Sequence, residues 1–297
     1  MDVSQHGIFE QGAMFHHYLE FKCPDKGNRT ALKAALRSWR STPLADGSTV
    51  VLAFGRRLWS EINPSGGPDG LRDFTSIVGT NNITAPASQR DLWVWIQGQA
   101  IDRNLDCALQ LCQQLQGIAE LDLEVQGFSY HENRDLIGFV DGTANPKTPP
   151  ERRDAALVTG THGGSFVLTQ KWVHNLTAFT SLAIHQQEAV VGRTKVDDVE
   201  LEGDAMPDDS HVSRTDASEN GIALKLWRRS APFGNAREHG LYFVAFACDI
   251  RRFDVQLQRM YGVSGDGLHD QLIHYSTAVT GAYWYAPGVI ELTKALD

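Results

Sequence analysis

One pattern occurs twice in this 297-residue chain and limits its possible folds more than any other sequence feature. An apolar strand is followed by an Asp and an Arg, and then by an amphipathic helix that ends at a glycine. The pattern spans residues 93–117 and recurs over 241–262. Its two aspartates, Asp102 and Asp249, lie 147 residues apart, close to half of the chain. A repeat of this length indicates two homologous domains of ordinary size.

The first half of the chain predicts strand, helix, strand, strand, helix and strand, in that order. Apolar runs predict strands over residues 13–21, 49–54, 91–98 and 121–128. Helical periodicity fills residues 29–40 and 104–116, and Gly117 ends the second of these helices. This order is that of the split βαβ, or ferredoxin-like, unit.

The second half repeats this order more loosely. Strands are predicted over 165–172, 221–227, 241–248 and 282–285, and helical segments over 175–194 and 249–261. We therefore predict an α+β fold of two ferredoxin-like domains with antiparallel sheets. Gly, Asn and Pro become frequent between Gly127 and Pro150, so we place the domains at residues 1–135 and 136–297.

The composition is that of a soluble globular protein, with 42% hydrophobic and 21% charged residues. Acidic residues outnumber basic ones by 36 to 27, and a net charge of −9 disfavours nucleic-acid binding. The apolar runs are far shorter than the roughly 18 residues of a membrane span. The first twenty residues show no export signal, so we expect a cytoplasmic protein.

Several common kinds of site lack their sequence motifs. The Walker, Rossmann, nucleophile-elbow and H-E-x-x-H patterns are absent from the sequence. The four cysteines form no C-x-x-C pair, which argues against a structural zinc site, a thioredoxin-like centre and covalently attached c-type haem. We expect the cysteines to be reduced, buried thiols.

The chemically interesting side chains each have an ordinary explanation when taken alone. Asp141 lies in Gly138-Phe139-Val140-Asp141-Gly142, and Asp-Gly is a routine turn pair. His211 follows an acid-rich stretch over 197–209 that reads as a solvated loop, since it lacks the spacing of a calcium loop. Arg193 and Arg228 follow apolar segments and are compatible with simple surface solvation, and Asp270 with the N-terminal acid of a short helix.

Taken together, these segments resemble the dye-decolorizing peroxidases, and among them the B-type subgroup. The residues that carry the resemblance are the G-x-x-D-G signature over 138–142, Gly-Arg-Thr-Lys over 192–195, Ser210-His211-Val212, the segment from Arg228 to Gly234, Glu238 to Phe243, and Thr280-Gly281-Ala282. Their order and approximate spacing match the subgroup, and they extend over essentially the whole chain.

The resemblance implies a non-covalent haem b, held mainly by the C-terminal domain. His211 would be its axial metal ligand, and Asp270 would accept the other ring N–H of that histidine. Asp141 and Arg228 would be the catalytic pair on the opposite side of the iron, and Arg193 would neutralise a haem propionate. The remaining expected cofactor-binding residues are Ser230, Asn145 and Phe243. The chain departs from the subgroup at Ala231, where Met is common, and at His274, where Asp is common.

The implied activity is that of a haem peroxidase. It would reduce H2O2 to water through a ferryl intermediate and oxidise dyes, phenols or other one-electron donors. The alternative is a haem-handling protein that stores haem or releases its iron, for which Asp141 and Arg228 would be unnecessary. We expect H2O2 and small reductants as partners, no nucleic acid or membrane, and self-association into a homo-oligomer. An encapsulin shell is a further possible partner, although no targeting tail is evident after Leu292.

Overall fold

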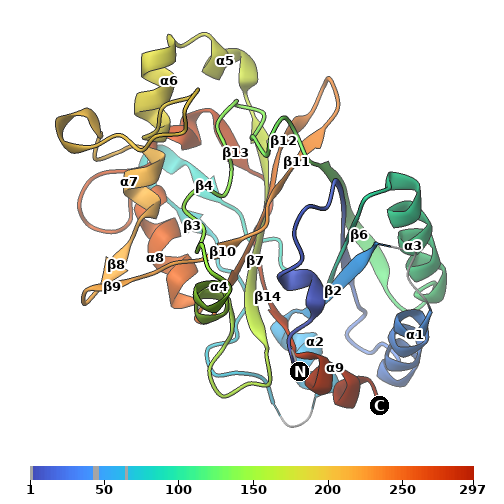
Figure 1. The fold of residues 1–297 in the computed structure, drawn as a ribbon. Helices are drawn as coiled ribbons and strands as arrows, with labels where there is room; N and C mark the ends of the chain where they lie inside the picture. Colours follow the sequence, from blue (N-terminus) through green and yellow to red (C-terminus); the bar gives the residue numbers. More distant parts are fainter. Residues whose placement is uncertain (1–2, 43–46, 64–65) are drawn as a thin grey trace.

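The first half of the chain forms an antiparallel four-stranded sheet with two helices on its outer face (Figure 1). The computed structural model describes residues 3–42, 47–63 and 66–297. The sheet order is β6-β1-β5-β2. The strands are β1 (Phe15–Lys22), β2 (Thr49–Phe54), β5 (Leu92–Gly98) and β6 (Glu120–Phe128), and the helices are α1 (Arg29–Ser41) and α3 (Ile101–Gln114). This arrangement is the predicted ferredoxin-like unit.

Helix α1 illustrates how the sequence pattern produces this layer. Leu32, Leu36 and Trp39 recur at helical spacing, and all three are buried against the sheet. The helix begins after Asn28, whose side-chain oxygen accepts a hydrogen bond from the backbone N–H of Ala31 at 2.9 Å.

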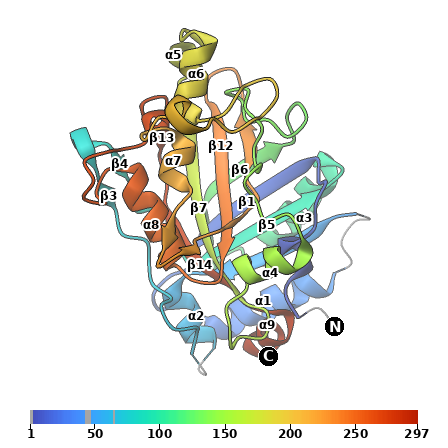
Figure 2. The same cartoon turned by 60° about the vertical axis from the view of Figure 1, so that its left-hand side comes forward.

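The second half builds a matching sheet in which β12 and β14 flank β7. Its strands are β7 (Ser165–His174), β10 (Trp227–Arg228), β11 (Ala231–Gly234), β12 (His239–Ala247), β13 (Ser276–Ala278) and β14 (Ala282–Ala286). Helices α7 (His211–Thr215) and α8 (Arg251–Met260) pack together against the same side of this sheet (Figure 2). Phe253 and Leu257 of α8 are buried.

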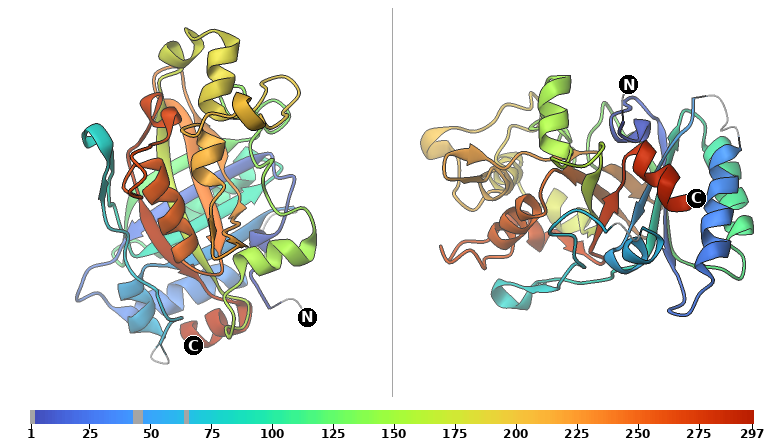
Figure 3. Two further views of the ribbon diagram at one scale, coloured as in Figure 1. Left: turned by 90° about the vertical axis from the view of Figure 1, so that its left-hand side faces the viewer. Right: turned by 90° about the horizontal axis from the view of Figure 1, so that it is seen from below.

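The two sheets join at both edges to form a closed ring of strands. Strand β11 meets β6 through the pair Phe233 and Gly127, and β14 meets β2 through Tyr285 and Phe54. The C-terminal helix α9 (Val289–Leu296) crosses to the first half and packs on α1 (Figure 3). The predicted fold of two ferredoxin-like units with antiparallel sheets is confirmed. The domain limits 1–135 and 136–297 stay a prediction.

Two predicted segments differ in the structure. The helical stretch over 175–194 is divided into α5 (Leu176–Thr180) and α6 (Ile184–Val191). The prediction of one strand over 221–227 is wrong. Only residues 222–223 and 227 of this stretch belong to strands, and those are two different short strands. Gly221 adopts a left-handed φ of 77° in the turn between β8 (Ser218–Glu219) and β9 (Ile222–Ala223), so the apolar run is used in a small hairpin.

Several short elements were not predicted. They are α2 (Arg56–Ile62), α4 (Pro149–Ala156), β3 (Ile77–Val78), β4 (Thr84–Ala85) and the 3-10 turns His6–Ile8, Thr80–Asn82 and Gly203–Ala205, whereas the short helix expected after Asp270 is present as the 3-10 turn Gln271–His274. They are too brief for periodicity to identify them.

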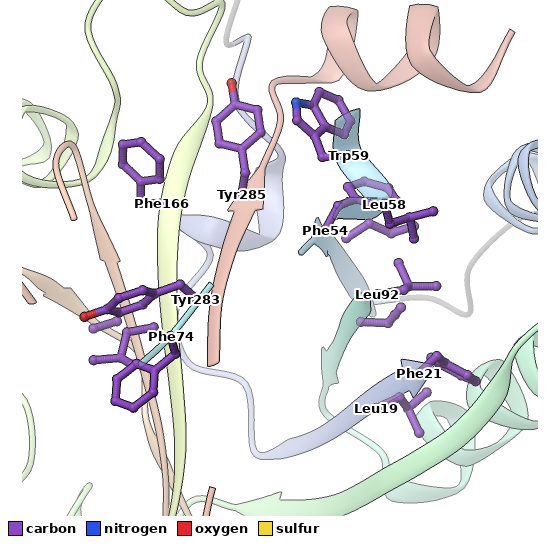
Figure 4. Close-up of a cluster of buried hydrophobic side chains, with 14 of the residues drawn as sticks. Leu19, Phe21, Phe54, Leu58, Trp59, Phe74, Leu92, Phe166, Tyr283 and Tyr285 are labelled. Carbon is purple, nitrogen blue, oxygen red and sulfur yellow. The ribbon is translucent and has the colours of Figure 1, made fainter. Parts of the chain in front are cut away.

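Aromatic side chains fill much of the core. Tyr285 packs against Trp59 and Phe166, and Tyr283 against Phe74 (Figure 4). The four cysteines are free thiols, of which Cys23 and Cys107 are buried while Cys112 and Cys248 are half-buried. Among the described residues, no helix has the length and apolar character needed to cross a membrane.

Candidate active site

A cavity with about 1000 Å³ of empty space, part of it open to solvent, lies in the second half of the chain. Every residue that lines it falls between Asp135 and Ser276. Its walls are mainly apolar, with Phe139, Leu168 and Trp172 among them. A large apolar cavity that contains a few polar groups is typical of a ligand site.

His211 projects into this cavity from the start of α7. Its Nδ1 lies 2.6 Å from Oδ2 of Asp270, a carboxylate with no solvent exposure. An ionised carboxylate only accepts hydrogen bonds, so Nδ1 carries the proton and Nε2 keeps its lone pair. Nε2 has no hydrogen-bond partner within the described residues, and 28% of the side chain is exposed. The ring is thus oriented, with one nitrogen available to a ligand or metal.

The local sequence positions this pair of residues. Ser210 caps α7 by accepting a hydrogen bond from the N–H of Ser213 at 3.2 Å, so that His211 is the first helical residue. Asp270 caps the next 3-10 turn, where its Oδ1 accepts from the N–H of Leu272 at 2.8 Å. The two segments are also joined directly, because the N–H of Gln271 donates to the carbonyl of Asp209 at 3.0 Å.

Asp141 enters the same cavity from a tight loop. Its backbone N–H donates to the carbonyl of Asn133 at 2.8 Å, and Gly142 follows with a left-handed φ of 79°. This φ favours glycine and turns the chain directly after the carboxylate. Burial raises the pKa of Asp141 above its ordinary value, although the positive charge of Arg228 partly offsets this effect.

Arg228 ends β10 and faces the cavity beside Asp141. Within the described part of the chain, its guanidinium has neither a hydrogen bond nor an ion pair, and burial lowers its pKa. A permanently charged group left without a partner in a cavity is costly unless a ligand compensates it. The structure thus places His211, Asp141 and Arg228 in the walls of one cavity, and the roles expected of them stay a prediction.

Asn145 holds the backbone of Arg228 in place. Its Nδ2 donates to the carbonyl of Arg228 at 2.9 Å, and its Oδ1 accepts from the N–H of Arg228 at 2.9 Å. The side chain therefore positions the strand end, and it lies outside the walls of the cavity that contains His211. Contact of Asn145 with a cofactor stays a prediction.

Replacing Asn145 with alanine is expected to lower the free energy of unfolding by about 1–3 kcal/mol, because both backbone groups of Arg228 lose their partner. Urea unfolding measures the change. Asn235→Ala is the matched control, since the Asn235 side chain also accepts two backbone hydrogen bonds but lies in an exposed turn. Equal losses in the two variants would contradict the positioning role.

The other predicted residues are distributed around the cavity. Arg193 lies beside His211 and Arg228, but its guanidinium pairs with Asp198 and Glu200, each at 2.8 Å. A propionate would have to join or displace these carboxylates. Phe243 and Asp270 line the same cavity as His211. Ser230 accepts from the N–H of Val244 at 3.3 Å and lies on the far side of Asp141.

Sequence reasoning missed a polar cluster in the cavity wall. His174 Nδ1 lies 2.7 Å from Ser276 Oγ, and its Nε2 lies 3.0 Å from Asp135 Oδ1. Asp135 also raises the pKa of Asp141 through its negative charge. These residues come from a loop and two paired strands, so no local motif contains them. The one available signal was that Asp135 lies in the same loop as Asp141.

Comparison with known proteins agrees with this arrangement. The Dyp-type peroxidase family matches over both parts of the chain, its N-terminal model over residues 41–129 and its C-terminal model over 132–291. The dye-decolorizing peroxidase of Mycolicibacterium paratuberculosis is 33% identical, over 81% of this chain and 70% of that protein.

Solved structures extend the likeness to the whole chain. The dye-decolorizing protein from V. cholerae is 35% identical with a TM-score of 0.87, over 98% of this chain and 99% of that one. A variant of DypB from Rhodococcus jostii RHA1, in complex with heme, is 28% identical with a TM-score of 0.90, and the match covers both chains fully. Both halves of the sequence and the fold therefore agree with these proteins, and the chain belongs to the Dyp-type peroxidase family.

Proposed function

We propose that the cavity beside His211 binds haem b and that Asp141 and Arg228 activate H2O2 there. Membership of the family makes the chain a haem-dependent peroxidase, and the proposal concerns which residues serve that activity. The single observation that carries it is the convergence of the free Nε2 of His211, the Asp141 carboxylate and the unpartnered Arg228 guanidinium on one cavity.

The residues present fit a haem group. A neutral imidazole with one free nitrogen is a common ligand of haem iron, and apolar walls suit a porphyrin. Asp270 would keep the His211 ring in one tautomer and increase its basicity. Arg193 lies where it could contact a propionate. When bound, haem supplies the electrons that reduce peroxide and later regains them from a donor.

Asp141 and Arg228 have separate roles in this proposal. Asp141 removes the proton from one oxygen of H2O2 and returns it to the other, which leaves as water. Arg228 stabilises the negative charge that develops as the O–O bond breaks, because its own charge is permanent and has no other partner here. A protein that only carried haem would not need either group in the cavity, which favours the peroxidase over a haem-handling protein.

The absorption spectrum of the purified protein tests this proposal. We expect a Soret band, and we expect that band to change after one equivalent of H2O2. Absence of a Soret band after reconstitution with haem would contradict the cofactor assignment. A band that did not respond to H2O2 would favour haem handling. H2O2 and small reductants are the proposed partners; a cytoplasmic location, self-association and association with an encapsulin shell stay predictions.

The reaction with H2O2 is expected to slow as the pH falls through the raised pKa of Asp141. A base must be ionised to accept a proton. The raised pKa therefore moves the acid limb, the part of the pH–rate profile where the rate falls with falling pH, to higher pH than for an ordinary aspartate. Attraction by Arg228 alone would have lowered the pKa of Asp141 and moved the acid limb to lower pH. The effect of burial is larger, so the pKa is raised.

Stopped-flow mixing with H2O2 between about pH 3 and 9 checks this prediction. Asp141→Asn should be slow throughout and should lose the acid limb, while Asp204→Asn, a change in the exposed acidic loop, should leave the profile intact. An acid limb that persists unchanged in Asp141→Asn would assign it to another group.

A further inference from the structure

A second cavity opens on the other side of Asp141 and Arg228. It has about 1040 Å³ of empty space, part of it open to solvent. Its walls come from the segment before and into β1, the loop after β6, the loop over 141–147 and the turn between β10 and β11. The two cavities share Asp141 and Arg228, so a molecule in the second would lie next to the peroxide-activating pair.

The second cavity collects positive charge. Arg134, Lys147, Arg152, Arg228 and Arg229 line it, and Asp141 is its only carboxylate among the described residues. Over the same residues, none of these five cations forms an ion pair with a carboxylate, so five positive charges face a single negative one. The lining of this cavity is therefore positive, although the chain as a whole has a net charge of −9.

The cations are held in place by neutral groups. Arg134 donates to the carbonyls of Gly138 and Lys195 at 2.9 and 2.8 Å. Arg229 donates to the carbonyl of Ile8 at 3.0 Å and to Gln97 Oε1 at 3.1 Å. Such contacts orient a guanidinium but leave its charge uncompensated. Burial lowers the pKa of Arg229 to about 10, which reflects the cost of this arrangement.

An aromatic surface accompanies the charge. Phe128 and Tyr130 line the cavity and meet edge to face, with ring centroids 6.4 Å apart. The ring of Trp227 is covered by Arg152 and Arg229, with centroid distances of 4.9 and 5.6 Å. Phe128 and Tyr130 are the phenyl and phenol rings of the lining that no cation covers among the described residues, and Tyr130 also packs against His131 with ring centroids 4.0 Å apart. Cations beside open aromatic rings suit a flat ring that carries a negative group.

We propose that this second cavity binds a phenolic carboxylate and holds it as the electron donor of the peroxidase reaction. The carboxylate would lie toward Lys147 and Arg152, away from the like charge of Asp141, and the phenol toward Arg228. Two donor molecules each lose one electron and one proton, and together these convert one H2O2 into two water molecules. The assignment rests on the proposed function, since it supplies that reaction with its reductant.

Three ligands that share a phenol ring test the charge preference. They are 4-hydroxybenzoate, neutral 4-hydroxybenzamide and cationic tyramine. Calorimetric titration of each into the resting holoenzyme gives its Kd without turnover. We expect 4-hydroxybenzoate to bind most tightly and its Kd to rise with ionic strength.

Lys147→Glu tests the location. Lys147 is exposed, and its Nζ contacts only the carbonyl of Thr143 among the described residues, so the fold should tolerate the change. The Kd and KM for 4-hydroxybenzoate should rise roughly tenfold, because an attraction becomes a repulsion. The neutral amide should be unaffected. Lys26→Glu makes the same change of charge in the exposed loop between β1 and α1, and it should alter neither ligand.

Two results would overturn the proposal: equal Kd values for the three ligands, or equal effects of Lys147→Glu and Lys26→Glu. Failure of the proposed function is a separate result, because it would appear as a Soret band that does not change when H2O2 is added. The titrations of resting protein do not depend on that response.

Discussion

His211→Ala is expected to yield a folded protein that retains almost no haem. His211 offers the one ring nitrogen in the cavity that is both oriented by a carboxylate and free of a partner among the described residues. The other cavity histidine, His174, has both nitrogens engaged by Ser276 and Asp135. His211 would be the residue that binds the haem iron, so without it haem would be held only by apolar contacts and by its propionates.

Haem-to-protein stoichiometry after reconstitution measures this loss, and circular dichroism reports whether the variant is folded. His185→Ala is the matched control, since His185 is exposed on α6. We expect that imidazole added to His211→Ala will partly restore haem binding, because it can occupy the vacated space. A His211→Ala variant with wild-type stoichiometry and an unchanged Soret band would mean that another residue is the ligand.

Arg228→Leu is expected to slow the reaction with H2O2 by about 10²–10³, the usual loss when one preorganised charge-stabilising group is removed. The guanidinium is already in place and unpaired, so its full effect is available as the O–O bond breaks. The leucine also removes the charge that opposes the raised pKa of Asp141. The acid limb of the pH profile should therefore move further upward.

Stopped-flow rates at several pH values separate these two effects. Arg228→Lys keeps a charge but not the planar fork of donors, and it should fall between the wild type and Arg228→Leu. Arg237→Leu removes an exposed arginine from the β11–β12 turn and serves as the control. Rates of Arg228→Leu that match those of Arg237→Leu would exclude Arg228 from peroxide activation.

The fold of the first half was readable from sequence because its signals are local. The strand over 49–54 coincides with β2, and the helix over 29–40 differs from α1 by one residue. The apolar residues of each repeat every two or every 3.6 positions, which is a property of a short stretch of chain. The strand over 221–227 failed for the same reason, since an apolar run does not reveal that Gly221 turns the chain back on itself.

The candidate site divides in a similar way. The resemblance pointed to His211, Asp141 and Arg228 through short motifs and to Asp270 as a matching position, and the structure places all four around one cavity. It did not indicate that Asn145 holds the backbone of Arg228, which lies 83 residues away. The second cavity could not be predicted from the sequence either. The chain carries a net negative charge, and the cations that line the cavity are spread over residues 134–229.

The sequence by itself thus determined the order of strands and helices, the duplication and the types of residue in each motif. These depend on backbone preferences and burial within a few consecutive residues. Only the tertiary structure decided how the ring closes, through single pairs such as Phe233 with Gly127 and Tyr285 with Phe54. It also decided which distant charges meet without partners. Pairing between distant segments depends on how the whole chain packs, and no local pattern specifies it.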